Sequence, residues 1–116
     1  MVGYKFFPPA DKSQNEIWDY TYKEWGEAQA DKYITGLHSH IQKLADKRLL
    51  WSPVPKSLVL PPDLEMEVFF SRYERHYLFF RELTEDMIGI MSILHDSMHI
   101  PVRLREDLEK ITGKTE

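Results

Sequence analysis

Apolar and polar positions follow a helical period in the first half of this chain. One stripe of apolar side chains recurs at steps of three and four residues over residues 10–25, and a second does so over residues 30–45. Gly26 lies between the two stripes. Two amphipathic helices separated by a short break share one core when they run antiparallel. The pattern therefore predicts an antiparallel helical hairpin over about residues 10–50.

Prolines, and then a period of two, replace this pattern in the second half. Residues 51–63 contain four prolines, which exclude a helix, so we expect an extended connector there. From residue 65 apolar and polar side chains alternate, as they do in strands. The second run is apolar on both faces and the third is almost entirely apolar, which is typical of a strand that is covered on both faces or central in its sheet. Three runs joined by short connections predict an antiparallel meander over about residues 65–95. The expected strands cover residues 66–70, 76–83 and 87–94.

The two ends of the chain complete the predicted fold. Residues 4–7 form a short aromatic run that ends at two prolines, and we expect it to be a strand. This strand should join one of the two edges of the meander, and the sequence does not indicate which edge. Pro101 begins a last helix over about residues 101–112, with Gly113 as its C-cap. The sequence thus predicts a single α+β domain over residues 1–116, with the helices packed on one face of an antiparallel sheet.

Composition narrows the classes of function. With 116 residues, of which 42% are hydrophobic, the chain can fill one core. It has no cysteine, which excludes disulfides, thiol catalysis and cysteine-based metal sites. A net charge of −4 disfavours a protein that grips nucleic acid non-specifically. No apolar run approaches the length of a membrane span, and we read no signal peptide.

Histidines are the first candidates for chemistry. His95 and His99 lie four residues apart with an acidic residue after the first, which superficially resembles a zinc-protease motif. That motif requires both histidines on one helical face, and Pro101 instead favours a turn. We therefore expect no metal and no cofactor. His38 and His40 point in different directions on their helix, and we expect solvated positions.

A basic cluster is the second candidate. Arg72 and Arg75 flank the first predicted turn of the meander, and Arg81 lies on the strand that follows, with Lys47 and Arg48 upstream. These side chains either form ion pairs at strand ends or build a small patch that recognises an anion. The candidate acidic partners for the ion pairs are Glu65, Glu67, Glu74 and Glu82.

Several residue strings also follow one another in the order and spacing of a known family. In the first half these are Ala10-Asp11, Glu16-Ile17-Trp18-Asp19-Tyr20, Trp25-Gly26, Ala28 to Ala30, Tyr33-Ile34, Leu37 and Leu44-Ala45. In the second half they are Arg75-His76-Tyr77-Leu78-Phe79-Phe80-Arg81, Ile93-Leu94-His95 and Ser97-Met98. Over about residues 4–104 the chain resembles the ParE-type toxins of the RelE/ParE toxin–antitoxin superfamily.

The resemblance implies a cytoplasmic bacterial toxin that a cognate antitoxin neutralises within a hetero-oligomer. Toxins of the ParE type poison DNA gyrase, whereas toxins of the RelE type cleave mRNA on the ribosome. Phe80 stands where the family commonly has a tyrosine, Ser92 where it often has an arginine, and His99 where it often has an aspartate. Together with the net charge of −4, these departures favour gyrase binding over RNA cleavage. We expect neither sequence-specific nucleic-acid binding nor membrane binding.

The same resemblance suggests which side chains meet a partner. The expected surface for the target or the antitoxin comprises Arg72, Arg75, Phe80, Arg81, His95 and Met98. In the alternative, a ribosome-dependent ribonuclease, His95 acts as acid or base and the arginines at positions 72, 75 and 81 bind the phosphate. A third possibility is a decayed toxin that is retained to autoregulate its operon with the antitoxin. We expect the antitoxin to contribute an amphipathic, partly disordered segment.

Overall fold

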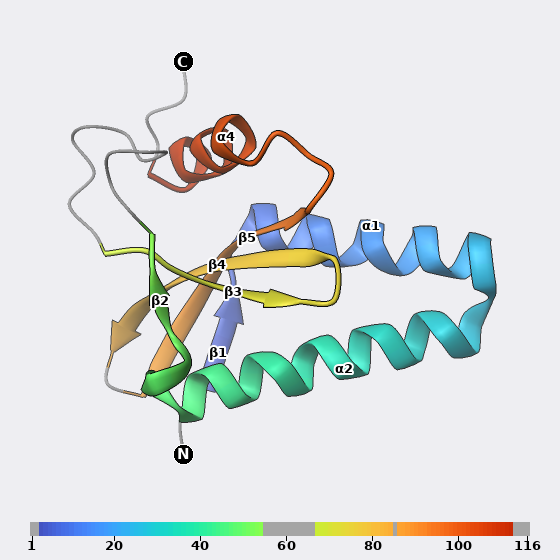
Figure 1. The fold of residues 1–116 in the computed structure, drawn as a ribbon, viewed down its shortest axis with the longest axis horizontal. Helices are drawn as coiled ribbons and strands as arrows, with labels where there is room; N and C mark the ends of the chain where they lie inside the picture. The colour runs from blue at the N-terminus through green and yellow to red at the C-terminus, as the bar shows by residue number, and fades with distance from the viewer. Residues whose placement is uncertain (1–2, 55–66, 85, 113–116) are drawn as a thin grey trace.

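The computed structural model describes residues 3–54, 67–84 and 86–112. Its elements confirm an α+β fold (Figure 1). In chain order they are β1 (Gly3–Phe6), α1 (Pro8–Trp25), α2 (Glu27–Asp46), the 3-10 turn η1 (Arg48–Leu50), β2 (Ser52–Pro53), β3 (Phe69–Tyr73), β4 (His76–Thr84), β5 (Met87–His95) and α4 (Ile100–Thr112).

The predicted helical hairpin is confirmed. Helix α1 begins two residues earlier than expected, because Pro8 and Pro9 occupy the first turn, where a missing N–H costs no hydrogen bond. Gly26 separates the helices with φ +94° and ψ 173°, and its N–H donates to the Tyr22 carbonyl at 2.8 Å. None of the described helices is both long and apolar enough to cross a membrane.

The meander is also confirmed, and two strands extend it to a mixed sheet in the order β1-β5-β4-β3-β2. Strand β1 joins the edge beside β5 and runs parallel to it, while the other neighbours are antiparallel. Strand β2 lies in the predicted connector, where Ser52 and Pro53 pair with Phe70 and Phe69. An edge strand tolerates proline because one side needs no N–H donor. The rest of the connector, the start of the first meander strand and Gly113 lie outside the described residues.

The expectation that all helices pack on one face of the sheet was wrong for α4. The hairpin and α4 lie on opposite sides of the sheet (Figure 1), and each covers its own core cluster. Leu78 and Phe80 of β4 pack towards the hairpin, whereas Phe79 between them packs towards α4. A strand that is apolar on both faces needs cover on both. Helix α4 supplies the second cover with Leu104 and Leu108.

Candidate functional site: a cleft under the helical hairpin

The hairpin extends well beyond the sheet at its Gly26 end (Figure 1). Because strands β3 to β5 stop short of it, the inner side of the hairpin is open there. A cleft of about 880 Å³ lies between α1, the first half of α2, the turn joining β3 to β4, and the end of β5. This cleft is the candidate site, and it is much larger than a second cavity of about 220 Å³ beside Arg48 and Trp51.

The outer wall of the cleft carries large exposed apolar side chains. Tyr20 is 61% exposed, Trp25 is 65% exposed, and their rings meet edge to face with centroids 6.2 Å apart. Met98, which is 39% exposed, lines the cleft from the segment after β5. Such side chains gain free energy when a partner removes them from water. Three such side chains in one cleft make it a candidate interaction surface.

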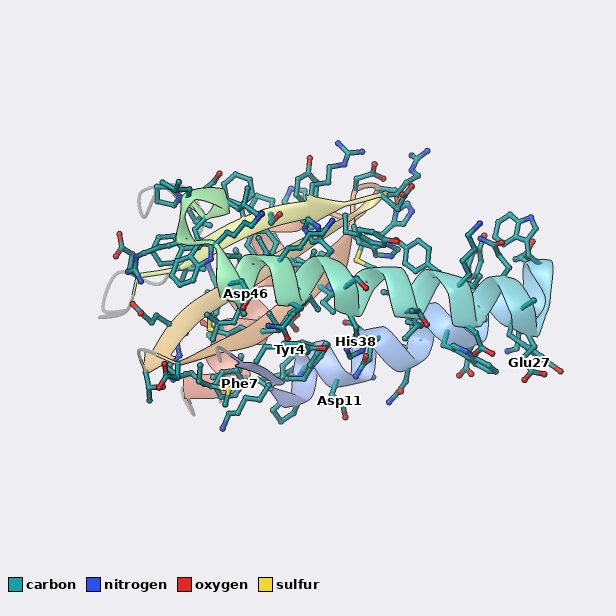
Figure 2. The ribbon with its side chains drawn as sticks, turned by 90° about the horizontal axis from the view of Figure 1, so that it is seen from below. Tyr4, Phe7, Asp11, Glu27, His38 and Asp46 are labelled. Atoms are coloured by element: carbon teal, nitrogen blue, oxygen red, sulfur yellow. The ribbon has the colours of Figure 1, made fainter. Side chains whose placement is uncertain are left out.

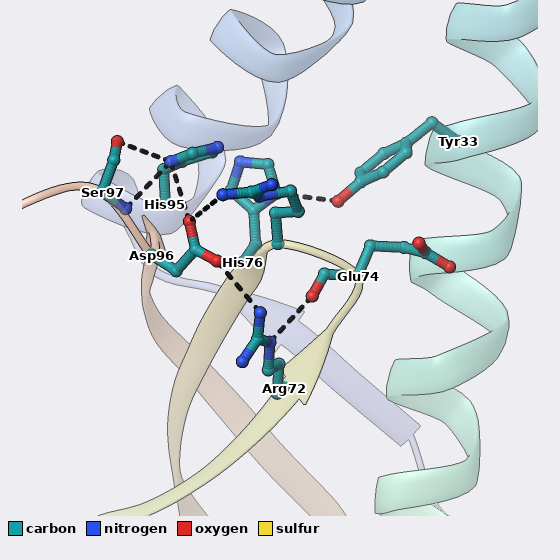
Figure 3. Close-up of polar contacts among 8 residues, drawn as sticks. Tyr33, Arg72, Glu74, His76, His95, Asp96 and Ser97 are labelled. Carbon is teal, nitrogen blue, oxygen red and sulfur yellow. Dashed lines mark hydrogen bonds and ion pairs between the residues drawn. The ribbon is translucent and has the colours of Figure 1, made fainter.

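A pair of histidines forms the inner end of the cleft. His76 of β4 lies opposite His95 of β5 in the strand register, with ring centroids 5.1 Å apart. The Tyr33 hydroxyl and Nδ1 of His76 form a 2.7 Å hydrogen bond that ties α2 to β4 (Figure 3). Burial, and secondly the neighbouring His95, lower the pKa of His76 to about 4, although Asp96 opposes this change. His76 is therefore neutral near pH 7. Burial also raises the pKa of Tyr33 well above its ordinary value.

Asp96 connects the basic side chains at the strand ends. Its carboxylate contacts Arg72 Nη2 at 3.0 Å and Arg75 Nη2 at 3.3 Å, and its backbone N–H donates to the Arg75 carbonyl at 2.8 Å (Figure 3). The predicted glutamate partners were wrong for these two arginines. Asp96 follows β5 directly, and the β4–β5 pairing brings it to the turn that carries the arginines. Glu82 does pair with a member of the predicted basic cluster, Arg48, at 2.9 Å.

The His95 ring is held in one orientation beside this ion pair. The backbone N–H of Ser97 donates to Nδ1 of His95 at 3.0 Å, and the Ser97 hydroxyl lies 2.7 Å from the same nitrogen. Nδ1 is therefore an acceptor. The Asp96 carboxylate lies 3.4 Å from Nδ1 and would form an ion pair only with a protonated ring. The other ring nitrogen is directed away from Ser97 and Asp96 (Figure 3).

The structure gathers only part of the predicted site. Arg75, His95 and Met98 line the cleft. Arg72 does not line it, but is linked to Arg75 because both guanidinium groups contact the Asp96 carboxylate. Phe80 is 0% exposed in the core between sheet and hairpin, so it offers no surface to a partner. Arg81 is elsewhere on the sheet, where its guanidinium lies 5.6 Å from the centre of the Phe7 ring.

Several cleft residues escaped sequence reasoning. Tyr20 and Trp25 belong to the apolar stripe of α1, which predicts burial, and only the overhang of the hairpin exposes them. Tyr33 likewise reads as a buried position on α2, and His76 as an ordinary strand residue. No local pattern distinguishes a stripe that meets the sheet from one that extends past it.

The prediction that His38 and His40 are solvated helix positions was wrong. Both are half-buried and hydrogen-bonded, and burial lowers the pKa of each. Nδ1 of His38 lies 2.8 Å from the Tyr4 hydroxyl (Figure 2), and Nε2 of His40 lies 2.9 Å from the Ser71 hydroxyl. These contacts fix α2 to β1 and β3. A helix residue facing a sheet has partners that its own helix does not reveal.

His95 and His99 are separated by a turn, as the sequence predicts. Residues 96–98 form the turn and bend, and α4 begins only at Ile100. Among the residues described, no group of three or more histidine, aspartate or glutamate side chains is arranged to hold a metal ion.

Comparison with known proteins identifies the family. The family described as "ParE toxin of type II toxin-antitoxin system, parDE" matches residues 4–100. The chain belongs to the ParE toxin family. Toxin ParE of Escherichia coli is 31% identical over 109 residues, which make up 94% of this chain and 99% of that protein. The resemblance read from the residue strings is thereby confirmed.

Other relatives extend this comparison. Toxin ParE1 of Mycobacterium tuberculosis is 28% identical over 97 residues, covering 84% of this chain and 92% of that protein. A solved structure described as "Chromosomal ParDE TA system from P. aeruginosa" has a TM-score of 0.60 at 18% identity and covers 82% of this chain and 96% of that one. The structural likeness shows a shared fold. Helix α4 follows the segment that the family matches.

Proposed function

We propose that this ParE-family chain inhibits DNA gyrase by binding to it, and that an antitoxin encoded beside it neutralises the inhibition in the cytoplasm. The observation that carries the proposal is the open cleft, whose exposed apolar side chains suit a protein partner. Such a mode of action requires a complementary surface and no reactive group. Membership of the ParE family supports the assignment.

The arrangement of the basic residues also supports binding over RNA cleavage. Arg72 and Arg75 are bound to Asp96, and Arg81 lies elsewhere on the sheet, so these arginines do not form one cationic site around His95. Phe80 lacks a hydroxyl and is enclosed in the core. A ribonuclease would need cations on the phosphate and groups that move protons at the ribose.

A supercoiling assay tests the proposal. Purified wild-type protein should inhibit supercoiling of plasmid DNA by gyrase. Trp25→Ala should weaken the inhibition at least about tenfold, because an aromatic side chain that becomes buried in a complex carries a large share of the binding energy. Tyr22→Ala is the matched control: Tyr22 is also exposed on α1 but does not line the cleft. A folded wild-type protein that leaves supercoiling unchanged over a wide concentration range contradicts the proposal.

One observation favours the ribonuclease as a second candidate. His95 and Arg75 line the same cleft, and Nδ1 of His95 is held by Ser97, which leaves the other ring nitrogen for proton transfer. If this activity exists, wild-type protein cleaves mRNA on ribosomes and His95→Ala abolishes the cleavage. Equal cleavage and equal toxicity of His95→Ala exclude it.

Neutralisation requires a complex with the antitoxin. We expect an amphipathic antitoxin segment to fill the cleft and cover Tyr20, Trp25 and Met98. A partner that binds only the folded toxin raises Tm as its concentration increases. The absence of any shift in Tm with excess antitoxin contradicts tight neutralisation.

Expression of the toxin without antitoxin tests the decayed-toxin alternative. Continued growth of the cells would favour a toxin that has lost its activity.

A further inference from the structure

We propose that the cleft selects its partner by charge: cationic side chains of the partner bind the carboxylates of Glu16 and Glu74 in the lining, beside apolar side chains that enter the cleft. This inference rests on the proposed function, because the antitoxin is the partner in question. It adds the chemistry of the recognised segment, which is apolar and basic rather than apolar and acidic.

The charges on the lining residues give the first argument. Glu16 lines the cleft from α1, and Glu74 lines it from the turn between β3 and β4. In the part of the chain that the structure describes, neither carboxylate forms an ion pair. Arg75 is the only arginine or lysine in the lining, and its guanidinium is already bound to Asp96. Because Asp96 is shared by Arg72 and Arg75, that group keeps one positive charge against the two glutamates, and the balance at the cleft is one negative charge.

The backbone at Glu74 gives the second argument. Glu74 has φ +53°, the left-handed region that favours glycine or asparagine, and no other described non-glycine residue has a positive φ. Its carbonyl accepts a hydrogen bond from Arg72 Nε at 2.9 Å, but any residue type would supply that carbonyl. The carboxylate extends away from Arg72 (Figure 3). The fold alone therefore gives no reason for a glutamate here, whereas a cationic partner does.

The position of Glu16 on α1 links the charge to the apolar wall. Ile17 follows it directly in the lining of the cleft, and Tyr20 and Thr21 line the cleft about one helical turn further along. A partner side chain at Glu16 is thus about one helical turn from the exposed ring of Tyr20, and the Trp25 ring lies further along the same helix against Tyr20. The segment that fits carries lysine or arginine next to leucine, isoleucine or aromatic side chains, and acidic segments are repelled.

Two synthetic peptides test the inference without antitoxin or gyrase. Both are ~15 residues long, near the length at which isolated helices become marginally stable, with leucines at identical positions of one face. One carries lysines at the remaining positions and the other glutamates. Titration is followed by the NMR signal of the Trp25 indole. We expect the lysine peptide to bind at least about tenfold more tightly at low salt, and to lose this advantage as salt is raised.

Variants of the chain assign the effect to the two carboxylates. Glu16→Gln/Glu74→Gln should bind the lysine peptide about tenfold more weakly than the wild type. Asp19→Asn is the matched control, since Asp19 is an exposed carboxylate of α1 that does not line the cleft, and it should bind as the wild type does. Equal binding of the two peptides, no perturbation of Trp25, or unchanged binding by the double variant overturns the inference.

Glu74→Gly separates recognition from folding. Removing the strained side chain should leave Tm equal or raise it, while the affinity for the lysine peptide falls. A lower Tm, or unchanged affinity, would mean that Glu74 serves the turn and would overturn its role in recognition. Gyrase inhibition by the wild type is measured separately from peptide binding. Inhibition without preference for the lysine peptide would overturn only this inference, and preference for the lysine peptide without inhibition would overturn only the proposed function.

Discussion

At the scale of the residue, a single glycine, Gly26, sets the geometry of the turn between the two helices of the hairpin. Gly26 combines φ +94° with ψ 173°, a region that side-chain-bearing L-residues almost never adopt. A Cβ built at this position meets nothing within 4 Å, so steric contact with other elements plays no part. The requirement for glycine is therefore one of backbone conformation alone.

We predict that Gly26→Ala lowers the free energy of unfolding by about 1–3 kcal/mol, the usual cost of a strained backbone position. Urea denaturation measures the change. D-alanine at position 26, introduced by chemical ligation, is the control: it accepts a positive φ and should leave the protein as stable as the wild type. Equal stability of the L-alanine and wild-type proteins contradicts the assignment.

His76 makes stability depend on pH. Its pKa is about 4 in the folded protein, against an ordinary value of 6.5, chiefly because it is buried. Between these values the unfolded chain binds a proton that the folded chain does not. The free energy of unfolding therefore falls as pH is lowered from about 6.5 towards 4. His38 and His40, whose pKa values burial also lowers, act in the same direction.

Urea denaturation from pH 7 to pH 5 tests this dependence. The contribution of one histidine to the slope is at most about 1.4 kcal/mol per pH unit, and partial exposure of the ring reduces it. His76→Gln should remove this part of the slope and leave the part due to the other buried histidines. An identical slope in His76→Gln would exclude His76 as the source.

At the scale of the element, one buried polar contact fixes α4 to the sheet. The Ser92 hydroxyl of β5 donates to the Asp107 carboxylate of α4 at 2.6 Å, and both side chains are buried. The surrounding contacts of α4 are apolar, chiefly through Leu104 and Leu108. Apolar contacts tolerate sliding, whereas a hydrogen bond between buried groups requires one register.

Ser92→Ala should therefore destabilise the protein by about 1–3 kcal/mol, because it leaves the Asp107 carboxylate buried without its donor. A double-mutant cycle with Asp107→Ala isolates the contact: the double variant should be less destabilised than the sum of the two single changes. Strictly additive effects in urea denaturation would show that the two side chains contribute independently.

The elements themselves were largely predictable. The stripes in α1 and α2 and the apolar runs in β4 and β5 are local patterns, and each produced an element close to its predicted bounds. The first meander strand was predicted less well, because β3 covers Phe69–Tyr73 and not residues 66–70. Strand β2 was missed because two residues carry no period, and they are recognised as a strand only through their pairing with β3. The site was predicted less well: Arg75, His95 and Met98 share the cleft, but Phe80 lies in the core and Arg81 elsewhere on the sheet.

At the scale of the whole molecule, the hairpin has one half that packs on the sheet and one half that extends past it. Near β1 the helices pack on the sheet through a fully buried core that includes Leu37 and Ile41. Near Gly26 the inner side of the hairpin borders the cleft, where Tyr20 and Trp25 remain exposed. The protein thus joins a rigid base to a less supported arm.

Native-state hydrogen exchange should report this division. Amides of residues 18–32 should exchange faster than those of residues 36–45, because fewer buried contacts oppose local opening at the arm. A partner that fills the cleft should slow exchange in the arm and leave the base nearly unchanged. Uniform protection along both helices of the free protein would contradict the division.

The sequence by itself determined the elements, the hairpin, the meander and the likeness to ParE-type toxins, because each depends on periods and strings that are local in the chain. Tertiary structure alone decided the parallel placement of β1, the position of α4 on the opposite face, and the cleft. These depend on where an element ends relative to another that is distant in sequence. An apolar stripe records that a side chain can be buried, and only the packed fold decides whether the protein or a partner buries it.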